Sequence, residues 1–454
     1  MDFTGEFYMD LLNDKISKLY FKFLSAAFGS ALVTSIYGVV DMAMVGQYHG
    51  PSGSAAMGVI APIWNIIYSF GLLVGIGGSV LYSFAKGESR SDSNPNKYFT
   101  ASVIFGISIS LILWIGIYAA EDSMLRLFGA NDDLLPLCRR YLVPVKLTVP
   151  VYIFTQIFAA FLRNDSNPGL ATKAVLIGGV FNVFGDYFLV FTMDMGIMGA
   201  GIATAMGASA SLIIMATHFI SKKNTLRFTK VDSIFKIFGK ISVSGFSTFI
   251  IDIAMGVLTM LFNRQIMKYL DTNALAIYAV IVNISTFVQC CAYGVGQACQ
   301  PIISQNFGAK KVGRINSLLK YSLASTAILG IIWTAAACLI PNGFIKLFMT
   351  PTEEILSLAP SIIRTYAVSF ILLPLNVYST FYFQAILKPN ISSFVSITRG
   401  IVLSGALIML LPAIFGGESI WLAMPITEAI IAVFVIFSMR AKQKEMKARF
   451  AMPD

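Results

Sequence analysis

Four carboxylates lie within long apolar stretches of the chain, where charged side chains are unusual: Asp41, Asp186, Asp252 and Glu428. Placing a charge at the centre of a bilayer costs free energy, so an acid there is commonly retained to bind a proton or a cation. Asp41 and Asp186 are the principal candidates, and Asp252 and Glu428 are additional buried acids. For each, the alternative is a structural acid that hydrogen-bonds to a neighbouring helix. No Lys or Arg is expected to lie as deep.

Two polar residues accompany one of these acids. Asn182 and Asp186 are four residues apart, which places them on the same face of a helix. Thr204 lies early in the next predicted helix, within GAGIATAMGAS, whose small residues allow close helix approach. A carboxylate, an amide oxygen and a hydroxyl together offer hard ligands for Na⁺ or a proton relay. On the residues alone, plain interhelical hydrogen bonding remains the alternative for Asn182 and Thr204.

The other reactive residue types form no catalytic or zinc-binding pattern. The cysteines contain no CxxC pair, and the chain has only His49 and His218 as histidines. The sequence also has no GxSxG elbow and no GxxxxGK[ST] phosphate loop. We therefore expect a protein that is not an enzyme, holds no cofactor and draws any work from an ion gradient. The cysteines, interpreted as packing residues, are Cys138, Cys290, Cys291, Cys299 and Cys338.

Composition places these residues in a membrane protein. Hydrophobic residues make up 56% of the 454 positions and charged residues 12%, whereas soluble domains carry about 25% charged residues. Because a spanning helix needs about 20 mainly apolar residues, the apolar runs predict an all-α integral membrane protein with twelve transmembrane helices. The predicted helices are 19–46, 54–85, 98–120, 141–162, 168–192, 196–220, 241–264, 274–305, 319–340, 359–386, 392–415 and 418–439.

The net charge of +10 has two explanations, an anionic ligand or topology signalling. Twelve spans place both termini on one side of the membrane, and 25 of the 33 Lys and Arg residues, Arg399 included, fall on that side. Because basic residues concentrate in cytoplasmic loops, both termini are expected in the cytoplasm. No loop holds a dense basic block, so a nucleic-acid partner is not expected. The segments counted are those up to residue 22, 85–97, 162–173, 221–240, 306–320, 387–399 and those after 438.

The chain also repeats itself at one constant, gap-free offset between its first and second halves. Six helices in each half give the halves the same orientation, and parallel repeats of this kind are a transporter architecture with a cavity between the halves. We predict an N-lobe over 1–220, a cytoplasmic linker over 221–240 and a C-lobe over 241–454 with a basic tail. The pairs that match at this offset are Ala55/Ala276, Val59/Val280, Ile60/Ile281, Val74/Val295, Gly75/Gly296, Ser83/Ser304, Gly87/Gly308 and Pro168/Pro389.

Several segments resemble the multidrug and toxic compound extrusion (MATE) family, and within it the DinF-like bacterial branch. The resemblance covers nearly the whole chain. The segments are YGVVDMAMVG (37–46), GIGGSVLYSFAKG (75–87), FLRNDSNPGLATKA (161–174), FNVFGDYFLVF (181–191), GIMGAGIATA (196–205) and YGVGQACQPIISQNFGAKK (293–311).

The resemblance implies a monomeric exporter in a bacterial cytoplasmic (inner) membrane, with two six-helix lobes. It would expel organic cations or other amphipathic drugs in exchange for H⁺ or Na⁺ by alternating access. Position by position, Asp41 matches the family's coupling acid, and Asn182, Asp186 and Thr204 match the polar network around it, which makes the four a candidate Na⁺ site. The chain departs from the family where a proline is common early in helices 1 and 7. Gly29 is the residue that would let helix 1 bend without one.

Two further alternatives stay open. A lipid-linked oligosaccharide flippase of the same superfamily would handle a phosphate-bearing substrate, so its cavity should present Arg or Lys, whereas the deep ionisable residues here are acids. A membrane-embedded enzyme would need a catalytic set near one interface, and the sequence shows none.

Overall fold

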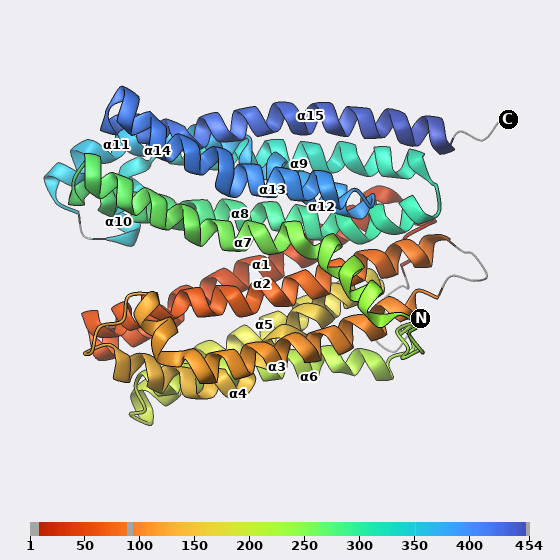
Figure 1. Cartoon of the computed structure of the whole chain (residues 1–454), viewed down its shortest axis with the longest axis horizontal. Helices are drawn as coiled ribbons and strands as arrows, with labels where there is room; N and C mark the ends of the chain where they lie inside the picture. Colours follow the sequence, from red (N-terminus) through yellow and green to blue (C-terminus); the bar gives the residue numbers. More distant parts are fainter. Residues whose placement is uncertain (1–8, 89–93, 350, 451–454) are drawn as a thin grey trace.

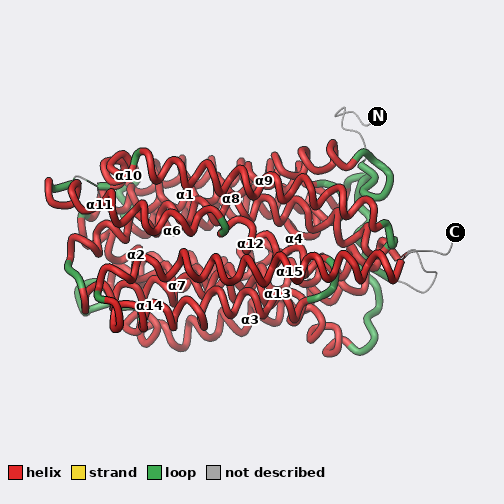
Figure 2. Tube along the Cα trace, turned by 90° about the horizontal axis from the view of Figure 1, so that it is seen from above, coloured by secondary structure: helices red, strands yellow, loops and turns green. Residues whose placement is uncertain are grey.

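The computed structural model describes residues 9–88, 94–349 and 351–450, and every regular element in these ranges is a helix. Figure 1 shows two helical lobes side by side, with the first half of the chain in red to lime and the second half in green to blue. The long helices run along the longest axis of the molecule (Figure 2). The described part of the chain begins and ends at the same end of the bundle, which we call the terminal end (Figure 1).

The N-lobe is built from six long helices. They are α1 (Ile16–His49), α2 (Pro51–Glu88), α3 (Asn96–Leu127), α4 (Leu135–Asn164), α5 (Pro168–Asp186), which continues as the π-helix η1 (Tyr187–Thr192), and α6 (Ile197–Ala216), which ends in the 3₁₀ turn η2 (Thr217–Ile220).

The C-lobe has the same succession of spans with more interruptions. Its first elements are α7 (Ile234–Tyr269), α8 (Thr272–Gly308), α9 (Val312–Leu339) and α10 (Pro341–Phe348). They are followed by α11 (Glu353–Ala367), η3 (Val368–Ile371), α12 (Leu373–Ala385), α13 (Pro389–Ile397), η4 (Thr398–Val402), α14 (Leu403–Phe415), η5 (Gly417–Leu422) and α15 (Ala423–Phe450).

Eleven helical segments of the described chain are long and apolar enough to cross a membrane, and α1 adds a helix of 34 residues beside them. The prediction of an all-α integral membrane protein is therefore confirmed. The span expected over 359–386 is not one regular helix. It is broken into α11 and α12 by η3, just before Pro374, because proline cannot donate the hydrogen bond that would continue the helix. The short α10, with eight residues, was not expected.

The first helix connects the two lobes. Near the terminal end, Tyr20 donates a hydrogen bond to Ser325 on α9 at 2.6 Å and stacks on Tyr321. Leu19, Tyr20 and Phe23 are buried in an apolar cluster formed mostly by the C-lobe. Further along, α1 packs against α5 of the N-lobe. One helix is therefore shared between two packing environments.

The lobes also meet along a seam formed by α2 and α8. Ser83 donates a hydrogen bond to the carbonyl of Pro301 at 3.3 Å, and Ser304 donates one to the carbonyl of Val80 at 2.8 Å. These two bonds are related by the internal repeat, because its offset carries Ser83 onto Ser304 and Val80 onto Pro301. We call these four residues, with Gly87 and Gly308, the α2–α8 seam.

The two glycines of the seam are required by the close approach of the helices. A Cβ on Gly87 would lie 2.0 Å from the carbonyl oxygen of Gln305, and a Cβ on Gly308 would lie 2.2 Å from that of Phe84. Since Gly87 and Gly308 are also related by the offset, the same small-residue contact occurs twice. The seam therefore packs backbone against backbone near the terminal end of α2 and α8.

Candidate functional site

Asp41 lies inside the N-lobe, where its side chain receives hydrogen bonds from two other helices. Its exposed fraction is 5%. Its Oδ2 accepts a hydrogen bond from the hydroxyl of Tyr141 on α4 at 3.1 Å and from the hydroxyl of Thr204 on α6 at 3.4 Å. The side-chain amide of Asn182 on α5 donates to Thr204 Oγ1 at 3.2 Å. Helices α1, α4, α5 and α6 therefore meet at this acid.

Several acceptor oxygens in this cluster have no hydrogen-bond partner in the described chain. They are Asp41 Oδ1, Asn182 Oδ1 and both carboxylate oxygens of Asp186. Asp186 is completely buried and lies one turn after Asn182 on α5. Leaving a buried polar atom unpaired costs free energy unless something satisfies it. The donor set therefore fits a proton or a small hard cation such as Na⁺.

The close packing of α5 and α6 sets the distance between Asn182 and Thr204. A Cβ on Gly178 or on Gly207 would lie 2.5 Å from the carbonyl oxygen of the other residue. Substituting either glycine would push the helices apart, so the glycines bring the amide within reach of the hydroxyl. The α-helix then gives way to the π-helix η1 directly after Asp186, a change of geometry that is common at functional sites.

Tyr141 is the member of the cluster that sequence reasoning missed. It is buried at 1% exposure, near the start of α4, and its hydroxyl is the nearest partner of Asp41 that the structure shows. Its position 100 residues from Asp41 has no periodic relation to the acid. A buried Tyr usually finds a partner for its hydroxyl, and that was the only available signal.

Asp252 lies in the other lobe and does not join the N-lobe cluster. Its Oδ1 accepts a hydrogen bond from the hydroxyl of Tyr293 at 2.7 Å, and Gln289 donates to that hydroxyl at 3.2 Å. The second oxygen, Oδ2, has no partner in the described residues. Asp252 therefore retains one free acceptor, while the Asp41 cluster has four.

Glu428 is neutralised by a deep arginine. Nε and Nη2 of Arg399 contact Glu428 Oε1 at 2.8 and 2.7 Å, and Asn376 donates to Oε2 at 2.6 Å. Both carboxylate oxygens are occupied, which is the arrangement of a structural acid. The prediction that no Lys or Arg lies as deep as the acids is wrong, and Arg399 does not belong among the basic residues of the terminal face. Because α13 begins at Pro389, Arg399 is ten residues into its span.

A further polar cluster lies near the terminal end of the N-lobe. Asp165, in the turn between α4 and α5, accepts hydrogen bonds from His218 at 2.8 Å, Lys86 at 2.7 Å and the backbone of Thr225 at 2.8 Å. Burial alone would raise the pKa of Asp165, but the His218 hydrogen bond and the Lys86 ammonium lower it to about 2. The cluster ties the segment after α6 to the ends of α2 and α4. His218 thus has a structural partner that sequence reasoning did not identify.

The remaining residues that sequence analysis considered have packing or capping positions. His49 Nε2 accepts a hydrogen bond from the backbone of Ile197 at 3.1 Å, where α6 begins. The five cysteines are free thiols, and Cys138, Cys291 and Cys299 are buried. In the described part of the chain, no group of three or more His, Cys, Asp or Glu residues could hold a metal ion. That finding does not concern Na⁺ held by mixed oxygen ligands.

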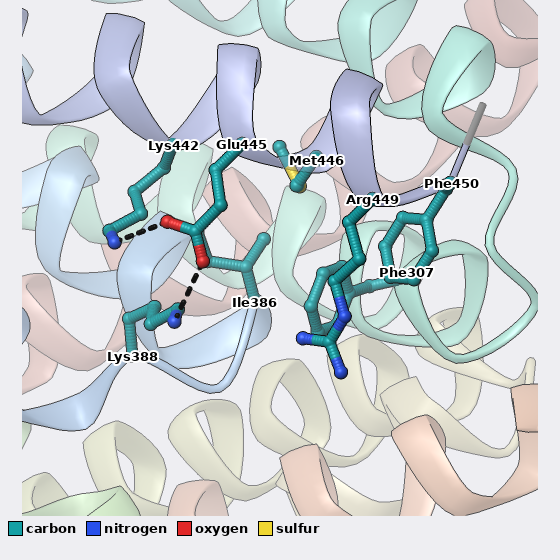
Figure 3. Close-up of a pocket in the computed structure, with 8 residues that line it drawn as sticks. All are labelled: Phe307, Ile386, Lys388, Lys442, Glu445, Met446, Arg449 and Phe450. Atoms are coloured by element: carbon teal, nitrogen blue, oxygen red, sulfur yellow. Dashed lines mark hydrogen bonds and ion pairs between the residues drawn. The ribbon is translucent and has the colours of Figure 1, made fainter.

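Two pockets lie outside the Asp41 cluster. One is inside the C-lobe, is lined in part by Arg399, and has about 530 Å³ of space not filled by protein, including space open to the surroundings. The other is at the terminal end, with about 260 Å³, between α8, α12 and α15 (Figure 3). In the second pocket, Glu445 forms ion pairs with both Lys388 and Lys442, while Arg449 lies beside Phe450 (Figure 3). The lysines and the arginine of this pocket are among the basic residues that the sequence analysis interpreted as topology signals.

The fold and the site define a multi-pass helical membrane protein of the transporter class, with two repeat-related lobes and a buried acidic cluster in one of them. A model of the MatE family matches the chain twice, over residues 26–188 and 248–409. The offset of the internal repeat carries the first match almost onto the second, so the two matches agree with the repeat. The chain belongs to the MatE family, a family of transporters rather than enzymes, as the sequence resemblance predicted.

Curated relatives and solved structures extend over nearly the whole chain. "Multidrug export protein MepA" of Staphylococcus aureus (strain MSSA476) is 23% identical over 417 residues, 90% of this chain and 91% of that protein. Its namesake in Staphylococcus haemolyticus (strain JCSC1435) is 23% identical over 431 residues, 92% of each chain.

The solved structure described as "Outward-facing conformation of a multidrug resistance MATE family transporter of the MOP superfamily" has a TM-score of 0.89 at 18% identity, covering 98% of this chain and 100% of that one. "Crystal structure of MATE in the bent conformation" gives 0.88 at 19% identity, with 97% and 98% covered. These structures establish the two-lobed fold.

Proposed function

We propose that this protein exports organic cations or other amphipathic compounds by antiport with H⁺ or Na⁺, through alternating access of the cavity between its lobes. The name of the curated relatives, a multidrug export protein, supports the substrate class. The observation that carries the coupling mechanism is the group of unpartnered acceptor oxygens on Asp41, Asn182 and Asp186. These oxygens, with Thr204, are the ligands we assign to the coupling ion.

Thr204 gives the cluster a way to respond when the ion binds. Its hydroxyl has one proton and two acceptors in reach, Asp41 Oδ2 at 3.4 Å and the carbonyl of Ala200 at 3.0 Å. An ionised Asp41 attracts that proton. A protonated or cation-bound Asp41 no longer needs it, and the hydroxyl then bonds within α6. Ion binding therefore weakens the link between α1 and α6, which changes how α1 packs.

We assign the terminal end to the cytoplasm, because the basic loops lie there. The α2–α8 seam joins the lobes in the half of the molecule near that end. These contacts support an outward-facing arrangement, in which the exchange of drug for ion would take place with the cytoplasmic side closed. The Asp41 cluster lies toward the opposite end, since it involves the last turns of α1 and α5 and the first turns of α4 and α6.

The test is transport of a fluorescent organic cation by purified protein in liposomes, with pH and Na⁺ gradients imposed separately. If a variant moves one charge fewer across the membrane in each transport cycle, the membrane potential supplies about 2.3 kcal/mol less driving force at 100 mV. The drug gradient that the variant can maintain then falls by a factor of roughly 50. We expect Asp41→Asn to show that loss. Asp122→Asn, which alters an exposed acid on α3, is the matched control and should transport normally. Unimpaired coupled transport by Asp41→Asn would refute the proposal, and the gradient that drives transport identifies the ion.

The flippase alternative has one observation in its favour, the deep Arg399. A phosphate-bearing substrate needs an uncompensated positive charge, but Glu428 neutralises this arginine at 2.7 Å. The N-lobe cluster contributes only acids and neutral groups. The described polar interior therefore favours a cationic or neutral substrate over an anionic one.

A further inference from the structure

The segment that leads into α1, residues 9–15, lies on the C-lobe although α1 continues into the N-lobe. The carbonyl of Leu11 accepts hydrogen bonds from the side-chain amide of Asn306 at 2.9 Å and from Nη2 of Arg314 at 3.1 Å. The same Nη2 donates to the carbonyl of Asp14 at 2.7 Å. We call residues 9–15 the N-terminal strap, and its backbone is held by donors of α8 and α9.

The N-terminal strap is also fastened to the C-lobe by a second cation and by apolar contacts. Lys311 Nζ donates a hydrogen bond to the carbonyl of Leu12 at 3.1 Å. The side chains of Met9, Leu11 and Ile16 are buried in the apolar cluster that the C-lobe mostly forms, and Leu11 is only 1% exposed. Burial of apolar side chains stabilises a contact roughly in proportion to the area removed from water. The strap is therefore a packed part of the C-lobe surface.

Immediately after the strap, α1 is attached to both lobes within a short distance. Phe23 is still buried in the C-lobe cluster. Three residues later, the carbonyl of Ala26 accepts a hydrogen bond from the hydroxyl of Thr172 on α5 at 2.7 Å. The hydroxyl of Ser30 then donates to Thr172 Oγ1 at 3.2 Å. Since three residues are less than one helical turn, the two lobes are joined through a single turn of α1.

The segment that leads into α7 makes a similar crossing for a different reason. The backbone of Thr225 donates to Asp165 at 2.8 Å, and the backbone of Thr229 donates to Thr100 on α3 at 3.0 Å. This segment connects α6 to α7, so its place on the N-lobe follows from the order of the chain. The N-terminal strap is followed by a helix that enters the N-lobe, so the non-covalent contacts described above hold it on the C-lobe.

Opening of the terminal end would have to break one of the two sets of contacts that α1 makes there. The C-lobe set includes bonds from the charged side chains of Lys311 and Arg314, and such bonds are stronger than those between neutral groups. The N-lobe set near the same end depends on the neutral hydroxyls of Thr172 and Ser30. The contact at Thr172 is therefore the weaker of the two.

We propose that the N-terminal strap and the first two turns of α1, residues 16–23, form a latch that holds the terminal end closed. When that end opens, the latch stays on the C-lobe and α1 parts from Thr172. The inference rests on the proposed function, because alternating access requires this end to open. It adds to that function the contact that must break before the α2–α8 seam can separate.

Hydrogen–deuterium exchange of the full-length protein in nanodiscs tests the latch, because amide exchange reports local opening. The seam is followed in residues 80–88 and 301–308, and the strap in residues 9–15. Thr172→Val replaces the hydroxyl by a methyl group. We expect seam exchange to become about two- to tenfold faster, the effect of losing one neutral hydrogen bond, while strap exchange is unchanged. Thr217→Val, at an exposed position of the N-lobe, is the matched control and should exchange like the wild type.

A second variant releases the latch from the other side. Leu11→Ala removes the apolar anchor of the strap, and we expect at least tenfold faster exchange in both the strap and the seam. Leu12→Ala is its matched control, because the side chain of Leu12 is not among the described residues of the C-lobe cluster. Its backbone carbonyl still accepts the bond from Lys311. Thermal unfolding identifies any variant that does not fold.

The inference is overturned if folded Thr172→Val and Leu11→Ala proteins both exchange at the seam like the wild type. It is also overturned if Thr172→Val speeds exchange of the strap together with the seam, since the strap would then leave the C-lobe. These measurements need neither drug nor ion gradient. Loss of the expected exchange pattern with coupled transport intact would remove only the latch, and the expected pattern without coupled transport would refute only the proposed function.

Discussion

At corresponding places in the internal repeat, the N-lobe has Gly178 and Gly207 where the C-lobe has Arg399 and Glu428. The glycines allow two backbones to touch, whereas the arginine and the glutamate form a buried ion pair at 2.7 Å. The N-lobe then holds Asp41 and Asp186, acids with no cationic partner in the described chain. One repeat thus provides two different polar interiors.

This difference separates a structural acid from an acid available to a ligand. Both carboxylate oxygens of Glu428 have protein partners, whereas both oxygens of Asp186 have none among the described residues. The burial of the two side chains is equal, at 0% exposure. Burial alone therefore does not distinguish these two acids, whereas the number of hydrogen-bond partners does.

The largest effect on stability should come from removing one member of the ion pair in the C-lobe. Arg399→Leu leaves Glu428 buried without a counter-charge, and we expect the free energy of unfolding to fall by about 3–5 kcal/mol. The double substitution Arg399→Leu with Glu428→Leu should be close to neutral, because an apolar pair replaces an ion pair. Denaturant titration in mixed micelles measures both. Equal destabilisation by the single and double variants would contradict the structural role of the pair.

Substituting the acids that lack partners in the described chain should reduce transport rather than the stability of the fold. Asp186→Asn removes a charge that nothing in the described protein compensates, so we expect it to fold normally and to lose a factor of roughly 50 in the drug gradient at 100 mV. Asp252→Asn should lose less, because the Tyr293 hydroxyl already satisfies one of its oxygens. Liposome transport measures both variants. A larger loss for Asp252→Asn would move the coupling site to the C-lobe.

The glycine contact can be tested with one added methyl group. In Gly207→Ala the new Cβ would lie 2.5 Å from the carbonyl oxygen of Gly178, and overpacking of this kind costs about 1–3 kcal/mol. We expect a lower thermal midpoint and weaker transport, because Asn182 moves away from Thr204. Gly256→Ala is the control, since its Cβ would meet no atom within 4 Å. If the two variants are equally stable, α5 and α6 do not need the close contact.

The smallest effect should come from the fully partnered acid of the N-lobe. The pKa of Asp165 is lowered from 3.8 to about 2, so its ionised form stabilises the folded protein above about pH 4, and this contribution is lost as pH falls toward 2. We expect Asp165→Asn to cost about 1–2 kcal/mol at pH 7 and progressively less below pH 4. Thermal unfolding at pH 7, 5 and 3 tests this. A difference that does not change with pH would show that Asp165 contributes through packing and not through its charge.

The architecture could be predicted from the sequence because the signals for it recur along the chain at regular lengths and spacings. Long apolar runs fix where a helix can cross a membrane, and the constant offset between matching residues predicted the two related lobes. The spacing of Asn182 and Asp186, with Thr204 in a run of small residues, also predicted a polar contact between two helices, which the structure shows.

Other features depend on contacts that have no local signal. Tyr141 reaches Asp41 across 100 residues of sequence, and nothing in its flanking residues, CRRYLVPVK, points to that acid. Arg399 was assigned to a loop face because a positive charge near a helix end usually belongs to the interface. Its pairing with Glu428 only becomes evident once η4 and α15 are placed side by side. The predicted range of a helix does not show which residue of another helix a long side chain will contact.

The α2–α8 seam has the symmetry of a homodimer within a single chain. Ser83 bonds to the carbonyl of Pro301 as Ser304 bonds to that of Val80, which is the reciprocal pattern of an isologous twofold interface. Two identical six-helix subunits would form the same contact with each other. The seam is therefore the part of the fused chain in which a substitution on one side has a direct equivalent on the other. By contrast, the inner sites of the two lobes have diverged.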